Sequence, residues 1–169
     1  MKNAQTSLQK RLHSDTIFTY IIVGVMGLSS VVRLVHFFIA LDNVRLAGDA
    51  YTGSVPGDLL SEALLYMFIA AAMLMLSLVL GEIHRTGKPF SKKNVNRFRA
   101  MGFILIFASI IPEAAKGLVG FADPTATYAT FQLLTARSLC VMFFGVVCGL
   151  VSEIFRYGYE LQDNMDSIA

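Results

Sequence analysis

Four long apolar runs constrain the fold of this chain more than any other feature of its sequence. They cover residues 17–41, 59–83, 100–121 and 128–155. Each run meets the length of about 20 residues that a helix needs to cross roughly 30 Å of hydrocarbon. Backbone polar groups in hydrocarbon must be hydrogen-bonded within the protein, so each run is expected to be helical. The sequence therefore predicts an all-α membrane protein with four transmembrane helices.

The composition argues against a water-soluble domain. Hydrophobic residues make up 55% of the 169 residues and charged residues only 15%, whereas typical soluble domains carry roughly 25% charged residues. The first run is too long for a cleavable signal peptide, and no small-residue cleavage site follows it. We therefore expect one transmembrane domain over residues 1–169. Its two cysteines, Cys140 and Cys148, lie about 12 Å apart along one helix and cannot bridge each other.

Basic residues predict the orientation of the chain. Of the 14 lysines and arginines, three lie in the N-terminal segment, six in the loop 84–99 and one in the tail 156–169. Basic loops stay in the cytoplasm, so both termini, this loop and this tail are predicted to be cytoplasmic. Short links then favour an up-down antiparallel bundle. The basic face is expected to contact anionic lipid headgroups. Nucleic-acid binding is not expected, because no aromatic stacking platform or helix-turn-helix pattern is present.

Small residues predict where helices end and where they touch. Gly87 and Pro89 are expected to end the second helix, and Ser91 is the expected N-cap of the third. Gly145 and Gly149 form a GxxxG pattern in the fourth run. Such a pattern permits close helix contact within the bundle or between copies of the chain. A homo-oligomer through these two glycines is therefore one expectation.

Six ionisable residues lie inside the apolar runs, where charges are costly and commonly mark functional sites. They are Arg33, His36, Glu62, Glu113, Lys116 and Arg137. At about 1.5 Å of rise per residue, all six fall within about 14 Å of the outer ends of the runs. Three are fixed cations and two are carboxylates, with one titratable histidine. This pattern predicts a polar pocket with a slight positive excess, for a small anion, lipid headgroup, peptide or proton. Pro112 is expected to kink the helix beside Glu113.

A purely structural interpretation of the same residues stays open. Glu113 with Arg137, or Glu62 with Arg33, would serve as ion pairs that hold neighbouring helices together. The Lys116 side chain is long enough to reach the outer interface.

Cofactor and enzyme motifs are missing from the sequence. A haem between helices needs two axial ligands at similar depth, and we place His13, His36 and His84 at three different depths. No HExxH, GxSxG or phosphate-binding glycine loop is present, and no aspartates pair within the runs. We therefore expect no catalytic residues, no metal and no cofactor.

Two segments carry a family resemblance. The first is GKPFSKKNVNRFRAMG, with Gly87, Pro89, Phe90, Asn94, Arg97 and Arg99 as its motif residues. The second is the tail EIFRYGYELQDNMDSIA, with Gly158, Leu161, Gln162, Asp166 and Ile168. Together they resemble the bacterial membrane family catalogued as domain of unknown function 2975.

The resemblance implies a four-helix protein of the bacterial inner membrane. Because members are often encoded beside small helix-turn-helix regulators, it also implies a regulatory or stress-related role, without established catalytic residues. Both motifs are cytoplasmic in the predicted topology. We therefore expect residues 89–99 to dock on the tail or on a protein partner, with Arg97 and Arg99 opposite Asp163 and Asp166.

The function that these observations favour is non-enzymatic binding of a ligand or partner, as a sensor or modulator, through the outer pocket. One alternative is a small oligomeric transporter or channel, which would need a polar lining in the inner half. Another is a structural or assembly factor, which would have one stoichiometric membrane partner.

Overall fold

The structure is a computed structural model that describes residues 2–47, 56–122 and 135–168, with the side chains of 13–46, 56–120 and 135–165. The described residues form four helices and no strand. These are α1 (Lys2–Ala47), α2 (Pro56–Thr86), α3 (Lys92–Ala122) and α4 (Ala136–Ile168). The prediction of an all-helical chain with four long helices is confirmed.

All four helices have the length and apolar character of membrane spans, over His13–Leu46, Pro56–Thr86, Lys92–Gly120 and Ala136–Met165. Large apolar side chains are widely exposed on them; Phe18, Leu28 and Phe103, for example, are 57–66% exposed. Such a surface is unfavourable in water and ordinary against lipid tails. The helices therefore indicate a multi-pass membrane protein.

The helices extend beyond the apolar runs. Helix α1 begins at Lys2, α3 begins at Lys92, and α4 continues to Ile168. The predicted loop 84–99 thus contracts to residues 87–91, and the predicted tail is largely helical. Hydropathy marks only the part of a helix that crosses hydrocarbon, whereas backbone hydrogen bonds continue through polar sequence as well. The start of the fourth run, residues 128–134, lies outside the described residues.

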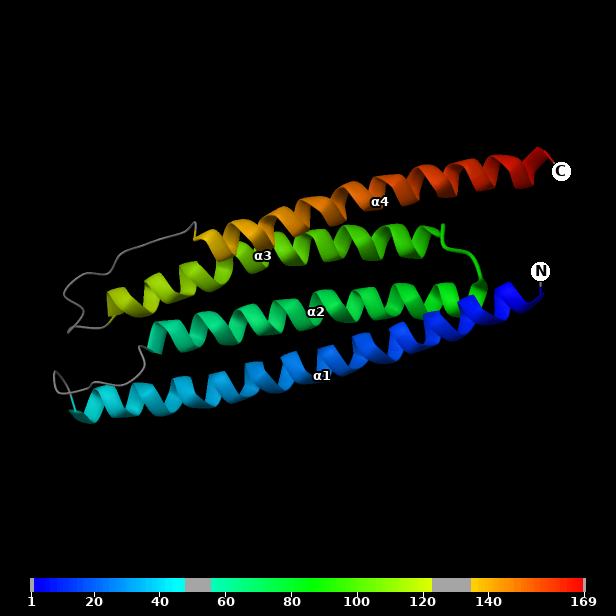
Figure 1. Cartoon of the computed structure of the whole chain (residues 1–169). Helices are drawn as coiled ribbons and strands as arrows, with labels where there is room; N and C mark the ends of the chain where they lie inside the picture. Colours follow the sequence, from blue (N-terminus) through cyan, green and yellow to red (C-terminus); the bar gives the residue numbers. More distant parts are fainter. Residues whose placement is uncertain (1, 48–55, 123–134, 169) are drawn as a thin grey trace.

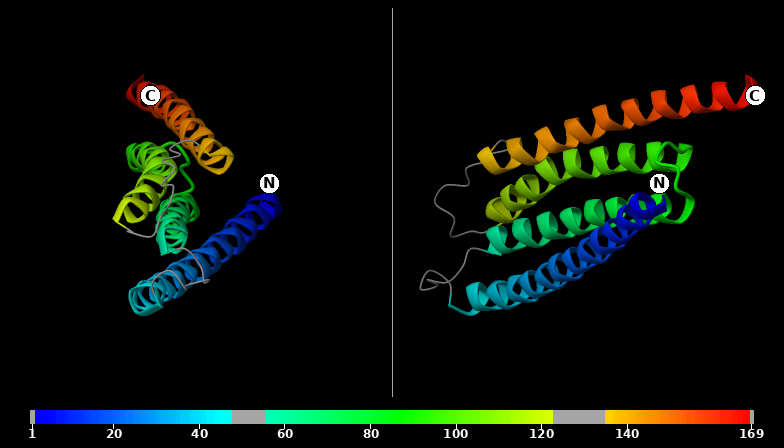
Figure 2. Two further views of the ribbon diagram at one scale, coloured as in Figure 1. Left: turned by 90° about the vertical axis from the view of Figure 1, so that its left-hand side faces the viewer. Right: turned by 45° about the vertical axis from the view of Figure 1, so that its right-hand side comes forward.

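The helices lie in chain order as an open row. Among the described residues, contacts join α1 to α2, α2 to α3 and α3 to α4, and no other pair of helices touches. Figure 1 shows the row from its side, with α1 and α4 at its two edges, and the left view of Figure 2 looks along the helices. This differs from the predicted bundle, in which four helices would enclose a shared core. Along the length of the helices, both chain termini lie at the same end, which we call the termini end. We call the other end of the helices the opposite end.

Glycines allow the close contact between α3 and α4. A Cβ atom added at Gly102 would lie 3.0 Å from the carbonyl oxygen of Gly145 and 3.2 Å from the backbone nitrogen of Gly149. The GxxxG face of α4 therefore packs against α3 of the same chain, which is one of the two arrangements that its spacing allows.

The turn between α2 and α3 forms as predicted. Gly87 adopts a φ of 67°, and its N–H donates to the carbonyl of Ile83 at 2.8 Å, which ends α2. The Ser91 hydroxyl accepts a hydrogen bond from the Asn94 backbone N–H at 3.2 Å and so caps α3. Further along α3, Pro112 is buried, and the helix is bent partway along its length in Figure 1. Pro112 accounts for this bend, because it leaves the carbonyl one turn earlier without its helical donor.

We expect Gly102→Ala to lower the free energy of unfolding by roughly 1–3 kcal/mol, because the added methyl group would press on backbone atoms that cannot rotate away. Thermal unfolding of the purified protein in detergent measures this. Gly24→Ala is the matched control, since a Cβ there meets nothing within 4 Å and alanine is the better helix former. Equal midpoints for the two variants would contradict the proposed contact.

Candidate functional site

A polar cavity of about 230 Å³ lies at the opposite end of the row, between α2, α3 and the start of α4. It is lined by Asp58, Ser61, Glu62, Glu113, Lys116, Thr135 and Arg137. Four of the six predicted pocket residues thus meet in one place. We call this site the polar cavity.

Two ion pairs fasten the helices around the polar cavity. Arg33 of α1 pairs with Glu62 of α2, as the structural interpretation predicted. Lys116 of α3 pairs with Asp58 of α2 through Nζ and Oδ1 at 2.6 Å. The side chains of the Lys116–Asp58 pair are about half exposed, so in water the pair would contribute little. In a lipid environment each pair instead offsets the cost of holding its charges.

The two remaining charges of the polar cavity are not paired with each other. Glu113 Oε1 accepts a hydrogen bond from Thr135 Oγ1 at 3.3 Å. Among the described residues, Arg137 makes no hydrogen bond or ion pair, although its side chain lines the same cavity. The structure therefore does not form the Glu113–Arg137 pair that the structural interpretation considered. One carboxylate and one guanidinium are left to face whatever occupies the cavity.

Arg33 and His36 belong to a second, more open hollow of about 530 Å³ on the α1 side. Its other lining residues are Val32, Ile39, Ala40, Asn43 and Leu59. The predicted layer of six ionisable residues is thus divided between two hollows. The Arg33–Glu62 pair stands between them, because each partner lines one hollow.

The sequence prediction missed Asp58, which lies just before the predicted apolar run 59–83. Asp58 lies in the first turn of α2, where a carboxylate is favoured by the helix dipole. The preceding Gly57 approaches α3 so closely that a Cβ there would lie 3.1 Å from the Lys116 carbonyl oxygen. With Asp58 included, the described set has three cations and three carboxylates, so the predicted positive excess is wrong. The sequence did carry a signal for this position of Asp58, because an acidic residue directly after Pro-Gly and before an apolar run is typical of the first turn of a helix.

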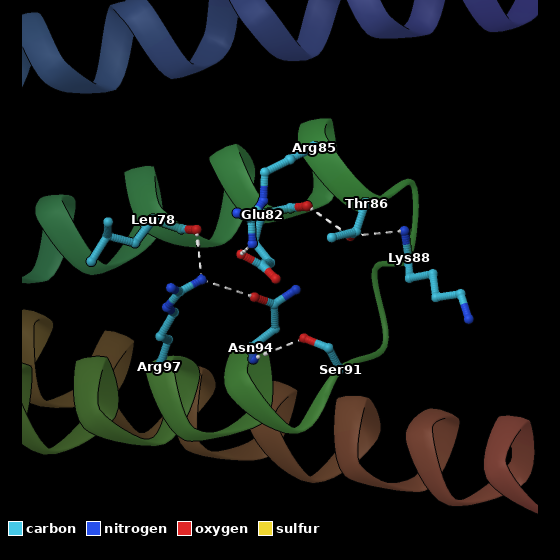
Figure 3. Close-up of polar contacts among 8 residues, drawn as sticks. All are labelled: Leu78, Glu82, Arg85, Thr86, Lys88, Ser91, Asn94 and Arg97. Carbon is cyan, nitrogen blue, oxygen red and sulfur yellow. Dashed lines mark hydrogen bonds and ion pairs between the residues drawn. The ribbon is translucent and has the colours of Figure 1, made fainter.

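A second polar network lies at the termini end, where α3 begins (Figure 3). Asn94 is fully buried, and its Nδ2 donates to the carbonyl of Pro89 at 3.0 Å. Arg97 Nη1 donates to Asn94 Oδ1 at 3.4 Å and to the carbonyl of Leu78 at 2.7 Å. Leu78 belongs to α2, so these two motif residues fasten the start of α3 to the neighbouring helix and to the turn.

The same turn is also held from the α2 side (Figure 3). The Thr86 hydroxyl donates to the carbonyl of Glu82 at 2.8 Å and accepts from the Lys88 N–H at 3.3 Å. Arg85 pairs with the Glu82 carboxylate at 3.1 Å. The turn is therefore tied to both helices that it joins.

The start of the second motif, residues 153–158, packs on this region through residues other than those expected. The Phe155 ring contacts the rings of Phe90 and Phe98, with centroids 5.3 and 4.7 Å apart. A Cβ at Gly158 would lie 2.6 Å from the Phe90 ring, so a side chain there would have to displace that ring. Arg99 pairs with Glu153 at 3.2 Å.

The expected match of Arg97 and Arg99 with Asp163 and Asp166 needs correction. Arg99 meets Glu153, and Arg97 meets backbone and amide groups, because the start of α3 faces an earlier part of α4 than we expected. The side chain of Asp166 lies outside the described residues.

The depths predicted for the histidines also need correction. The rings of His13 and His84 lie side by side, with centroids 5.6 Å apart. Because α1 is continuous from Lys2, His13 lies at the level of the end of α2. The described residues contain no cluster of three or more His, Cys, Asp or Glu that could hold a metal. Among the described residues, His13 and His84 therefore have no third side chain with which they could hold a metal ion.

The chain matches a known protein family. The profile of a family described as "Protein of unknown function (DUF2975)" matches residues 20–168. No curated protein and no solved structure matches the chain.

We expect Asn94→Ala to destabilise the protein by about 1–3 kcal/mol, because it removes a buried side chain that is hydrogen-bonded to both Pro89 and Arg97. Asn96→Ala is the matched control, since Asn96 is exposed on the same helix. Thermal or denaturant unfolding of both variants measures the difference. A loss as large in Asn96→Ala would contradict the role given to Asn94.

Double-mutant cycles should separate the paired charges from the unpaired ones. For Arg33→Leu with Glu62→Leu we expect a coupling energy of roughly 0.5–3 kcal/mol, as for residues in contact. For Arg137→Leu with Glu113→Leu, measured in ligand-free protein, we expect a coupling below that range. A strong Arg137–Glu113 coupling would mean that these charges hold the helices together.

Proposed function

The chain belongs to the DUF2975 family of proteins of unknown function, and we propose that it is a non-enzymatic sensor or modulator that binds a small zwitterion in the polar cavity. We place it in the bacterial inner membrane, with both termini in the cytoplasm and consecutive helices antiparallel. The concentration of lysine and arginine around the turn 87–91 and in the N-terminal segment supports this orientation. The polar cavity then opens in the outer half of the membrane.

The observation that carries this proposal is the pair of unmatched charges in one cavity. Each of the two ion pairs, Arg33–Glu62 and Lys116–Asp58, is neutral in itself. Arg137 and Glu113, in contrast, line the same cavity without pairing. A bare anion would match Arg137 and leave Glu113 unmatched. A bare cation would do the reverse. A molecule with both an oxyanion and an ammonium group matches both.

The chemistry of the lining supports a phosphate or carboxylate joined to an ammonium. A guanidinium binds either oxyanion through two parallel hydrogen bonds, and a carboxylate accepts from an ammonium. The cavity of about 230 Å³ is below the roughly 300–1,000 Å³ of pockets for drug-sized ligands. It therefore suits a molecule of the size of phosphoethanolamine, either free or as the headgroup of a lipid.

The helices that line the polar cavity also carry the network at the termini end. Glu113 and Lys116 lie on α3, and Asn94, Arg97 and Arg99 begin the same helix and bind α2 and α4. A ligand that draws α4 toward α3 at Arg137 would change the packing of that pair along its length. This supports a sensor whose cytoplasmic readout is the docking of the tail on residues 89–99.

Transport is a weaker proposal. A conducting path would need polar groups in the half nearer the termini end. Ser77 is fully buried there, but its hydroxyl donates to the carbonyl of Met73 in its own helix at 2.8 Å. The Ser77 hydroxyl is thus hydrogen-bonded within its own helix.

We expect free phosphoethanolamine to stabilise the purified full-length protein against thermal unfolding more than inorganic phosphate or ethanolamine at equal concentration. At about 100 times the Kd, the gain would be about 2.7 kcal/mol. If the ligand is a lipid, the free compound has no effect. Nanodiscs of phosphatidylethanolamine then stabilise the protein relative to phosphatidylglycerol.

Arg137→Gln and Glu113→Gln should each abolish the stabilisation. Arg45→Gln should retain it, because Arg45 is an exposed cation of α1 outside the cavity lining. The proposal fails if neither the free compound nor the lipid stabilises the protein, or if Arg137→Gln responds as the unaltered chain does.

A further inference from the structure

Helix α4 presents a continuous apolar stripe on the face that points away from α3. The stripe repeats every 11 residues, as in Leu139, Leu150 and Leu161, and in Phe143, Ile154 and Met165. These side chains are 47–68% exposed. The face toward α3 is instead marked by Gly145, Ser152 and Phe155, which are buried or packed against α3. The stripe is therefore a surface that no described part of the chain covers.

The stripe is too long to be covered by lipid alone. From Leu139 to Met165 it runs about 39 Å at 1.5 Å per residue, whereas the hydrocarbon layer is roughly 30 Å thick. Glu153 and Arg156 are the first charged residues after the apolar part of α4. Leu161 and Met165 lie about 12 and 18 Å beyond Glu153 along the helix. We therefore place both side chains outside the hydrocarbon, where water surrounds the helix.

No described segment of the chain is placed to cover this part of α4. The helix is continuous to Ile168 and extends past the turn between α2 and α3 in Figure 1. Helix α1, which carries the other terminus, lies at the opposite edge of the row. A straight extension of a membrane-crossing helix also cannot lie flat on the membrane surface.

We propose that the stripe of α4 is the interface of a parallel homodimer. Two copies inserted in the same orientation would bring the same residues together across a twofold axis along the membrane normal. An 11-residue apolar repeat suits two long helices that pair in a right-handed supercoil. At roughly 100 Å² for each half-exposed large side chain, these six residues present on the order of 600 Å², the lower end of the roughly 600–1,000 Å² that one partner contributes to a standard interface.

The charges beside the stripe are compatible with this pairing. Arg156 pairs with Glu153 at 3.1 Å and with Glu160 at 3.6 Å on the same helix. The flank of each copy is therefore partly neutralised before the copies meet, which lowers the repulsion between like charges. The interface is also separate from the GxxxG face, which α3 already covers.

Disulfide cross-linking in membranes tests the interface. In the full chain with Cys140→Ser and Cys148→Ala, we expect Leu161→Cys to form a cross-linked dimer under mild oxidation. Asp163→Cys should stay monomeric, because Asp163 is exposed but faces away from the stripe. Cross-linking of both positions to the same extent, or of Asp163→Cys alone, would contradict the proposal.

A mass measurement provides the independent readout. The unaltered protein in nanodiscs should have the mass of two copies, and the Leu161→Glu/Met165→Glu variant should have the mass of one with its thermal midpoint unchanged. These positions lie beyond the hydrocarbon, so the variant should still insert. The proposal is overturned if the unaltered chain is monomeric, if the variant stays dimeric, or if a different protein accompanies one copy in a fixed ratio.

Discussion

A charge inside hydrocarbon is stable only beside an opposite charge or in a polar cavity, and this constraint governs how the four helices meet. Arg33 with Glu62 joins α1 to α2, and Asp58 with Lys116 joins α2 to α3. At the joint of α3 and α4 the constraint is met differently. Glu113 and Arg137 share a cavity without pairing, which is why we assign the ligand to this joint.

Because the helices form an open row, each interface between neighbouring helices is held by its own set of contacts. Since only consecutive helices touch among the described residues, no common core holds the layer together. The joint of α1 and α2 uses an ion pair and the cluster of Phe37, Ala40 and Leu59. The interface of α3 and α4 uses glycine contacts, the contact between the Phe98 and Phe155 rings, and the Arg99–Glu153 pair. A change at one joint can therefore alter it without unpacking the others, as a sensor requires.

The sequence predicted features that depend on local chemistry. Four helices follow from apolar length, the turn at Gly87 and Ser91 from capping chemistry, and the Arg33–Glu62 pair from opposite charges at neighbouring depths. Features that depend on the relative placement of helices were missed. Asp58 joined the cavity because Gly57 lets α2 approach α3, and His13 reached His84 because α1 is continuous. The open row was also missed, since apolar faces look the same whether they meet lipid or another helix.

The most direct test of the ligand proposal is an experimental density map of the protein in nanodiscs of phosphatidylethanolamine, or with phosphoethanolamine added. We predict density for an oxyanion against the Arg137 guanidinium and for an ammonium against the Glu113 carboxylate, with the Arg33–Glu62 and Asp58–Lys116 pairs intact. A map in which Arg137 and Glu113 bind each other and close the cavity would contradict the account, because the charges would then only hold the helices together.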